Sequence, residues 1–125
     1  MTDKQPKVFV VQENPNLNYT PAERYGEVVF LTAIEFSPMK NSPRNAAVLE
    51  TVEAAMKRFD PSKDYLLLSG NPIIMGYVFH LVMTKAAEVR VLWWSRDDRK
   101  YTEVLFNPDF IKSVGIPAIP VTYKK

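Results

Sequence analysis

The turn from Ser69 to Pro72 holds the groups best suited to chemistry in this 125-residue chain, because it leads from an apolar strand into a helix. Backbone amides and a helix dipole at the end of a parallel strand commonly bind phosphates or carboxylates. The same residues also suit plain capping, since Asn71 can accept from a helix amide and Gly70 tolerates a sharp corner. The glycines and lysine of the phosphate-binding fingerprints are absent. We therefore favour capping and keep Ser69, Gly70, Asn71 and Pro72 as candidate ligand-binding residues.

A second candidate site is the segment RVLWWSRDDRKY at 90–101, which mixes aromatic and cationic side chains. Such mixtures stack bases and neutralise phosphates in proteins that bind single strands. Alternation along a strand, however, puts Trp93 and Trp94 on opposite faces, which predicts one tryptophan in the core and the other under a helix or the tail. Asp97 and Asp98 also dilute the positive charge, so we favour a plain hairpin over a nucleic-acid site. The candidate interaction surface comprises Arg90, Trp94, Arg96, Arg99, Lys100 and Tyr101.

Catalytic and metal-binding groups are scarce. The chain has no cysteine, which excludes disulfides, a thiolate nucleophile and cysteine-ligated metals. Its one histidine, His80, lies in an apolar helical segment without a ligand partner at suitable spacing, which predicts a buried neutral histidine. Four glutamates near loops share no motif spacing, and we assign no role to Glu13, Glu23, Glu27 or Glu35. We assign no catalytic residue, no metal ligand and no cofactor, and we lean against an enzyme.

The elements that would position these groups form an α/β fold. Runs rich in β-branched and aromatic residues predict five strands, at 7–12, 27–33, 64–70, 89–95 and 101–106. Two main helices are expected, one from Ser42-Pro43 to Asp60-Pro61 and one over 72–88. A capping box at Thr20 predicts one further helical turn closed by Gly26. We expect a single small domain over 1–107, with a mixed sheet of about five strands, a parallel centre and a C-terminal antiparallel hairpin.

Two apolar segments suggest association. The helix at 72–88 is apolar on every side, which predicts that it is buried on two sides. The tail at 108–125 is apolar and contains prolines, so we expect it to pack on its own domain or on a neighbouring protomer. Together they predict a homo-oligomer, most simply a dimer. A net charge of +2 gives no support for a nucleic-acid or membrane partner. The polar start of the chain and the short apolar run at 73–83 predict a soluble cytoplasmic protein with no signal peptide.

Three motifs follow one another along the chain, P-A-x-x-Y-G at 21–26, D-x-L-L-L-x-G-N-P at 64–72 and L-x-W-S-R at 92–96. In this order they resemble a group of small tailed-bacteriophage proteins of unassigned activity. The resemblance implies that those relatives have aspartate at the positions of Asn71 and Ser95. This chain therefore lacks two carboxylates, which further weakens the case for an enzyme. The resemblance implies a phage accessory protein made in the bacterial cytoplasm.

The predicted function is that of a non-catalytic binding protein acting on a host or phage component. One alternative is a nucleotide or phosphometabolite binding protein or enzyme that uses the turn at Gly70 to Pro72. The other is single-stranded nucleic-acid binding through the hairpin at 90–101.

Overall fold

The computed structural model describes residues 5–39, 42–113 and 115, and it contains one mixed five-stranded sheet. The strands are β1 (Lys7–Val10), β2 (Glu27–Phe30), β3 (Tyr65–Leu67), β4 (Val89–Ser95) and β5 (Lys100–Phe106), in the order β2-β1-β3-β4-β5. The first four are parallel, and β5 pairs antiparallel with β4. This confirms the predicted α/β class and the C-terminal hairpin. Because the chain leaves β1 toward β2 and later crosses to β3, the topological switch lies between β1 and β3.

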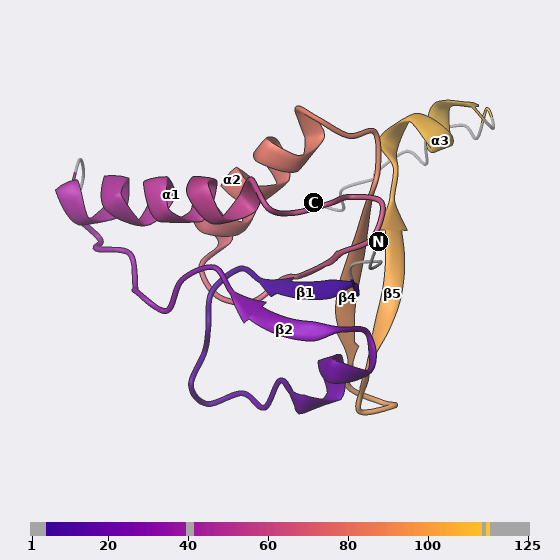
Figure 1. Ribbon diagram of the computed structural model, residues 1–125, viewed down its shortest axis with the longest axis horizontal. Coiled ribbons are helices and arrows are strands. Elements are labelled where there is room, and N and C mark those ends of the chain that lie inside the picture. Colours follow the sequence, from indigo (N-terminus) through magenta and orange to yellow (C-terminus); the bar gives the residue numbers. More distant parts are fainter. Residues whose placement is uncertain (1–4, 40–41, 114, 116–125) are drawn as a thin grey trace, which may run out of the picture.

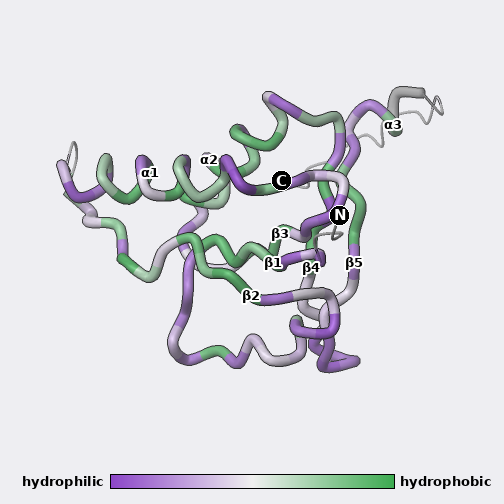
Figure 2. The backbone as a smooth tube through the Cα atoms, in the orientation of Figure 1, coloured by the Kyte–Doolittle hydropathy of each residue, from purple (hydrophilic) through white to green (hydrophobic). Residues whose placement is uncertain are grey.

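Helices cover the two faces of this sheet unequally (Figure 1). The two long helices, α1 (Pro43–Met56) and α2 (Pro72–Met83), lie on one face and share one core with the sheet, in which Val52, Leu66 and Val78 are fully buried. The other face is covered by a loop and the 3-10 helix η1 (Thr20–Arg24), around a smaller core that contains Tyr19 and Leu67. In Figure 2, α2 is mostly apolar, whereas α1 carries apolar and polar residues in turn.

Local capping explains where both long helices begin. The Ser42 hydroxyl accepts from the Arg44 amide at 3.2 Å, and the Asn71 side chain accepts from the Ile73 amide at 2.8 Å. These are the predicted N-caps. The predicted ends are wrong, because α1 stops at Met56 and α2 at Met83.

The predicted capping box at Thr20 is also wrong, although the short helix exists. Its N-cap is Tyr19, and no side chain caps it. The amide of Thr20 instead donates to the Asn18 side chain at 3.0 Å. Tyr19 is only 7% exposed, so burial of this ring, rather than a cap, fixes where η1 begins.

Helix α2 is buried along one stripe only, formed by Ile74, Val78 and Val82. Ile73 is 64% exposed, so the described residues cover this helix on one side. The prediction of a buried His80 is wrong, since His80 is exposed. The reason is geometric, because His80 stands two residues, about 200° around the helix, from both Val78 and Val82. Covering of the other side by the tail or by a second protomer stays a prediction.

The segment after β5 begins with a short helix, α3 (Pro108–Ser113). The rest of the predicted apolar tail, residues 116–125, lies outside the described residues. Among the described residues, no helix is long and apolar enough to cross a membrane.

Candidate binding site at the carboxyl ends of the strands

The turn at Ser69 to Pro72 lies at the carboxyl end of β3, beside the switch between β1 and β3. Its groups already bind one another and the loop after β1. The Asn71 amide donates to Gln12 Oε1 at 2.6 Å, while Gln12 Nε2 donates to the Ile34 carbonyl at 3.0 Å. The Ser69 and Tyr19 hydroxyl oxygens share a hydrogen bond of 2.7 Å.

Gly70 is required at this corner for two reasons. Its φ of +99° is one that residues with a side chain rarely adopt, and a Cβ added there would collide with the Gln12 side chain. Because Gln12 accepts from the Asn71 amide and the Asn71 side chain accepts from the Ile73 amide, fewer amide donors remain for an anion. The geometry therefore supports capping at Ser69 to Pro72, the interpretation favoured from the sequence.

The β4-β5 hairpin extends beyond the rest of the sheet. Within β4, only Arg90 to Leu92 pair with β3, so Trp93, Trp94 and Ser95 pair with β5 alone. As a result Trp93 is 62% exposed and Trp94 is 38% exposed. The prediction that one tryptophan enters the core and the other is covered is wrong, because the sheet has no third strand at this level.

A hollow of about 540 Å³ lies on the η1 side of this hairpin, against the carboxyl ends of β3 and β4. Its wall is largely apolar and includes Leu17 and Pro21 from the loop before β2, Leu68 after β3, and Trp94. Leu17 is 52% exposed and Leu68 is 39% exposed, so an incoming group can reach both side chains. Arg96 also lines the hollow.

The Tyr101 hydroxyl and the Arg96 guanidinium line the hollow, and neither has a polar partner among the described residues. Tyr101 is 6% exposed and packs edge-on against the Trp94 ring at 4.9 Å, but its hydroxyl makes no hydrogen bond with any described residue. Burial, and secondarily the nearby Tyr19, raise the pKa of this phenol above its usual value of 10.0. Arg96 forms no ion pair within the described part of the chain, whose one salt bridge joins Lys7 and Glu27. The hollow thus combines apolar walls with an available hydroxyl and a cation.

The remaining residues of the predicted interaction surface lie elsewhere. Arg90 stands four residues before Trp94, and its guanidinium sits over the Tyr65 ring at 5.8 Å. Arg99 and Lys100 lie at the turn of the hairpin, where Arg99 has a positive φ of 52°. The structure therefore joins Trp94, Arg96 and Tyr101 in one hollow and separates Arg90 from them.

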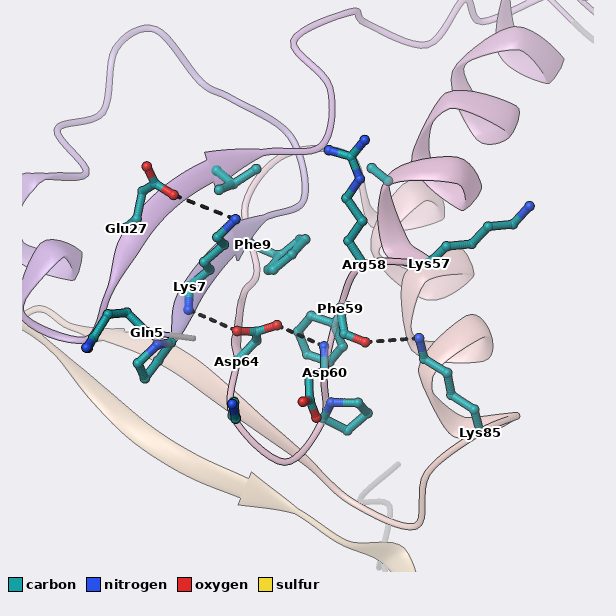
Figure 3. A pocket seen from close by; sticks show the side chains of 15 residues that line it. Gln5, Lys7, Phe9, Glu27, Lys57, Arg58, Phe59, Asp60, Asp64 and Lys85 are labelled. Atoms are coloured by element: carbon teal, nitrogen blue, oxygen red, sulfur yellow. Dashed lines mark hydrogen bonds and ion pairs between the residues drawn. The ribbon is translucent and has the colours of Figure 1, made fainter. Parts of the chain in front are cut away.

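A larger hollow of about 940 Å³ lies at the opposite, amino ends of the strands (Figure 3). Several of its polar groups stabilise the fold. The Asp64 carboxylate accepts from the amides of Lys7 at 2.9 Å and Asp60 at 2.8 Å. Lys85 Nζ donates to the carbonyls of Met56 and Phe59, both at 3.1 Å, and so caps the end of α1. Since α/β proteins bind ligands at the carboxyl ends of their strands, we assign this hollow a structural role.

The sequence analysis missed three loop residues that line the hollow beside Trp94, which are Leu17, Tyr19 and Pro21. It also missed the two hydrogen bonds by which the Gln12 side chain joins Asn71 to Ile34. The one available signal was Leu17, an apolar residue in a stretch otherwise rich in asparagine and proline. No group of three His, Cys, Asp or Glu residues that could hold a metal ion occurs in the part of the chain that the structure describes.

Comparison with protein families identifies the relatives of this fold. The family model described as Phage Pam3 gp32-like protein matches residues 6–108, which is well over half of the chain. The chain belongs to this family. It is therefore a small phage protein, as the resemblance implied, and the match includes all five strands and the hollow beside Trp94. No curated protein and no solved structure matches the chain significantly.

Proposed function

We propose that this Phage Pam3 gp32-like protein is a non-catalytic binding protein that captures a host or phage protein in the cytoplasm of the infected bacterium. The observation that carries the proposal is the hollow beside Trp94, which offers apolar walls, an unengaged Tyr101 hydroxyl and the unpaired Arg96. Such a site suits a partner that inserts an aromatic or aliphatic side chain and brings a carboxylate to the arginine.

Energetic arguments favour this kind of partner. Aromatic and arginine residues dominate the binding energy of protein interfaces when they surround a desolvated pocket. The walls are already assembled from three segments, the loop at 17–21, the end of β3 and the β4-β5 hairpin, so little ordering is required on binding.

Binding can be measured with a variant in which Trp94 is the one remaining tryptophan. In Trp93→Phe, fluorescence comes from Trp94 alone, because the chain has two tryptophans, and the phenylalanine keeps an aromatic ring at position 93, which also lines the hollow. We expect peptides with an aromatic residue next to an acidic residue to change this fluorescence at saturable concentrations. Arg96→Ala should weaken the effect, whereas Arg99→Gly removes a cation outside the hollow and should not. Equal losses in both variants would contradict the site.

The biological partner can be sought by affinity capture from infected cells. The wild-type protein and Trp94→Ala are compared, with Ile73→Ala as the control, because Ile73 is exposed on α2 and does not line the hollow. A protein that Ile73→Ala retains and Trp94→Ala loses fits the proposal. If no protein distinguishes the two variants, the proposed function fails.

Single-stranded nucleic-acid binding is the second candidate, favoured by the exposed Trp93 near Arg99 and Lys100 at the hairpin turn. Its hallmark is an affinity that falls steeply with salt, with a shallower slope when phosphate-contacting cations are removed. We expect no oligonucleotide binding at near-physiological salt. Salt-sensitive binding with a shallower slope in the double variant Arg99→Gly and Lys100→Ala would favour nucleic acid instead.

A further inference from the structure

Strand β5 is an edge of the sheet, since β4 is its one neighbour among the described strands. Tyr101 is buried, and its carbonyl accepts from the Tyr25 hydroxyl at 2.9 Å, so η1 occupies the turn end of this strand. From Thr102 to Phe106 every residue is exposed. The free edge is therefore a five-residue segment whose central residue is Val104.

This segment lacks the features that prevent pairing with another strand. Natural edges are protected by lysines, prolines, bulges or short length. Residues 102–106, TEVLF, contain one charged residue and no proline, and their register with β4 is continuous. Val104 is 45% exposed, Leu105 is 52% exposed and Phe106 is 42% exposed. An exposed apolar edge of this kind favours strand addition.

Apolar side chains lie on both faces of the edge. Phe106 contacts the Phe79 ring of α2 at 5.3 Å, so Phe106 and, two residues away, Val104 face the side of the long helices. Leu105 faces the η1 side, as does Tyr101, whose ring packs against Trp94. A strand added to this edge would therefore bury apolar surface above and below the sheet.

We propose that the occupant is β5 of a second copy of this chain, paired antiparallel and centred on Val104. About this centre the segment complements itself, because Thr102 lies opposite Phe106 and Glu103 lies opposite Leu105. A register centred on Glu103 sets two carboxylates directly opposite each other, which is destabilising. The Val104-centred register avoids this and uses the whole free edge, so that one continuous sheet runs through both copies.

The absence of cysteine makes the register directly testable. Residues facing each other across antiparallel strands have Cβ atoms about 4.5–5.5 Å apart, within reach of a disulfide. Val104→Cys should therefore form a covalent dimer under mild oxidation. Thr102→Cys lies about 13 Å from its own symmetry mate, a span of four residues, and should not. A mixture of Thr102→Cys and Phe106→Cys should cross-link between the two variants.

Sedimentation equilibrium tests the same interface without cross-links. Val104→Lys should raise the dimer dissociation constant about tenfold or more, since each copy loses an apolar contact and gains a repelling charge. Ile34→Lys changes a similarly exposed residue (50%) just after β2, at the opposite edge of the sheet, and should leave the constant unaltered. Circular dichroism confirms folding, and Leu105→Lys provides a second test on the other face. A monomeric wild type, a dimer indifferent to both edge variants, or equal cross-linking of Thr102→Cys and Val104→Cys would each overturn the proposal.

Discussion

Replacing Gly70 by alanine should destabilise the protein strongly, although it adds only one methyl group. The φ of +99° disfavours any side chain, at a cost of about 1–2 kcal/mol. The new Cβ would also displace the Gln12 side chain, which bridges the Asn71 amide and the Ile34 carbonyl. Losing these two hydrogen bonds costs about 1 kcal/mol each. The free energy of unfolding should therefore fall by about 3–4 kcal/mol in total.

Urea denaturation followed by far-ultraviolet circular dichroism measures this loss. Tryptophan fluorescence is the weaker probe here, because both indole rings lie at the exposed hairpin end. The slope of free energy against urea should stay constant while the midpoint falls. In a thermal scan, the loss corresponds to a melting temperature lower by about 12–16 °C.

Measuring Gly70→Ala in two Gln12 variants separates the steric collision with Gln12 from the backbone strain at position 70. An alanine at position 12 still carries the Cβ that Gly70→Ala meets, whereas a glycine does not. Gly70→Ala should therefore remain costly in Gln12→Ala, but should cost only the strain of about 1–2 kcal/mol in Gln12→Gly. If Gly70→Ala changes stability by less than about 0.5 kcal/mol in the wild-type background, as an ordinary surface substitution does, the reasoning is refuted.

Three further changes test the helix cap at Asn71, the hydrogen bonds of Asp64 at the amino ends of the strands, and the buried Tyr101 phenol. Asn71→Ala should lower the free energy of unfolding by about 1 kcal/mol, while Asn71→Asp keeps the acceptor and should equal or exceed the wild type; a stable Asn71→Ala would contradict the cap. Asp64→Ala leaves two backbone amides without their acceptor and should cost about 2–4 kcal/mol by the same urea assay, whereas Glu27→Ala, which breaks an exposed ion pair, should cost less than about 1 kcal/mol. Because the pKa of Tyr101 is raised in the folded state, its contribution is present below the unfolded pKa of about 10 and is lost as pH rises through the folded pKa. Unfolding free energy should therefore drop at alkaline pH, and less so in Tyr101→Phe.

The architecture was predictable because local signals agreed with the global fold. Ser42 and Asn71 predict helix starts because their side chains can accept from the first helix amides, and both act as the predicted caps. The span of β4 was also predicted correctly, because its run of β-branched, aliphatic and aromatic residues is long and is interrupted only at Arg90. Strand order and helix ends depend on partners distant in sequence. Lys85, for example, caps the end of α1 although it follows α2.

The candidate site was predictable only in part. Trp94, Arg96 and Tyr101 lie close in sequence, so one segment reveals them together. The wall formed by Leu17 and Leu68 comes from two loops that meet only in the folded protein. The exposure of both tryptophans could not be predicted for another reason. The alternation argument assumes that β4 has a neighbouring strand on both sides, but β3 ends at Leu67 and does not reach the tryptophans.

The position of β1 between β2 and β3 also constrains the order of folding. The hydrogen bond from the Lys7 amide to Asp64 closes a loop between residues 57 positions apart, whereas the β4-β5 hairpin closes over a turn of four residues. Because short loops close far faster than long ones, the hairpin can form before the central strands pair when the full-length chain refolds. During synthesis β1 must remain without its β3 partner until that strand has left the ribosome. For that interval its apolar residues are open to other chains, and the nascent protein is then most prone to aggregate.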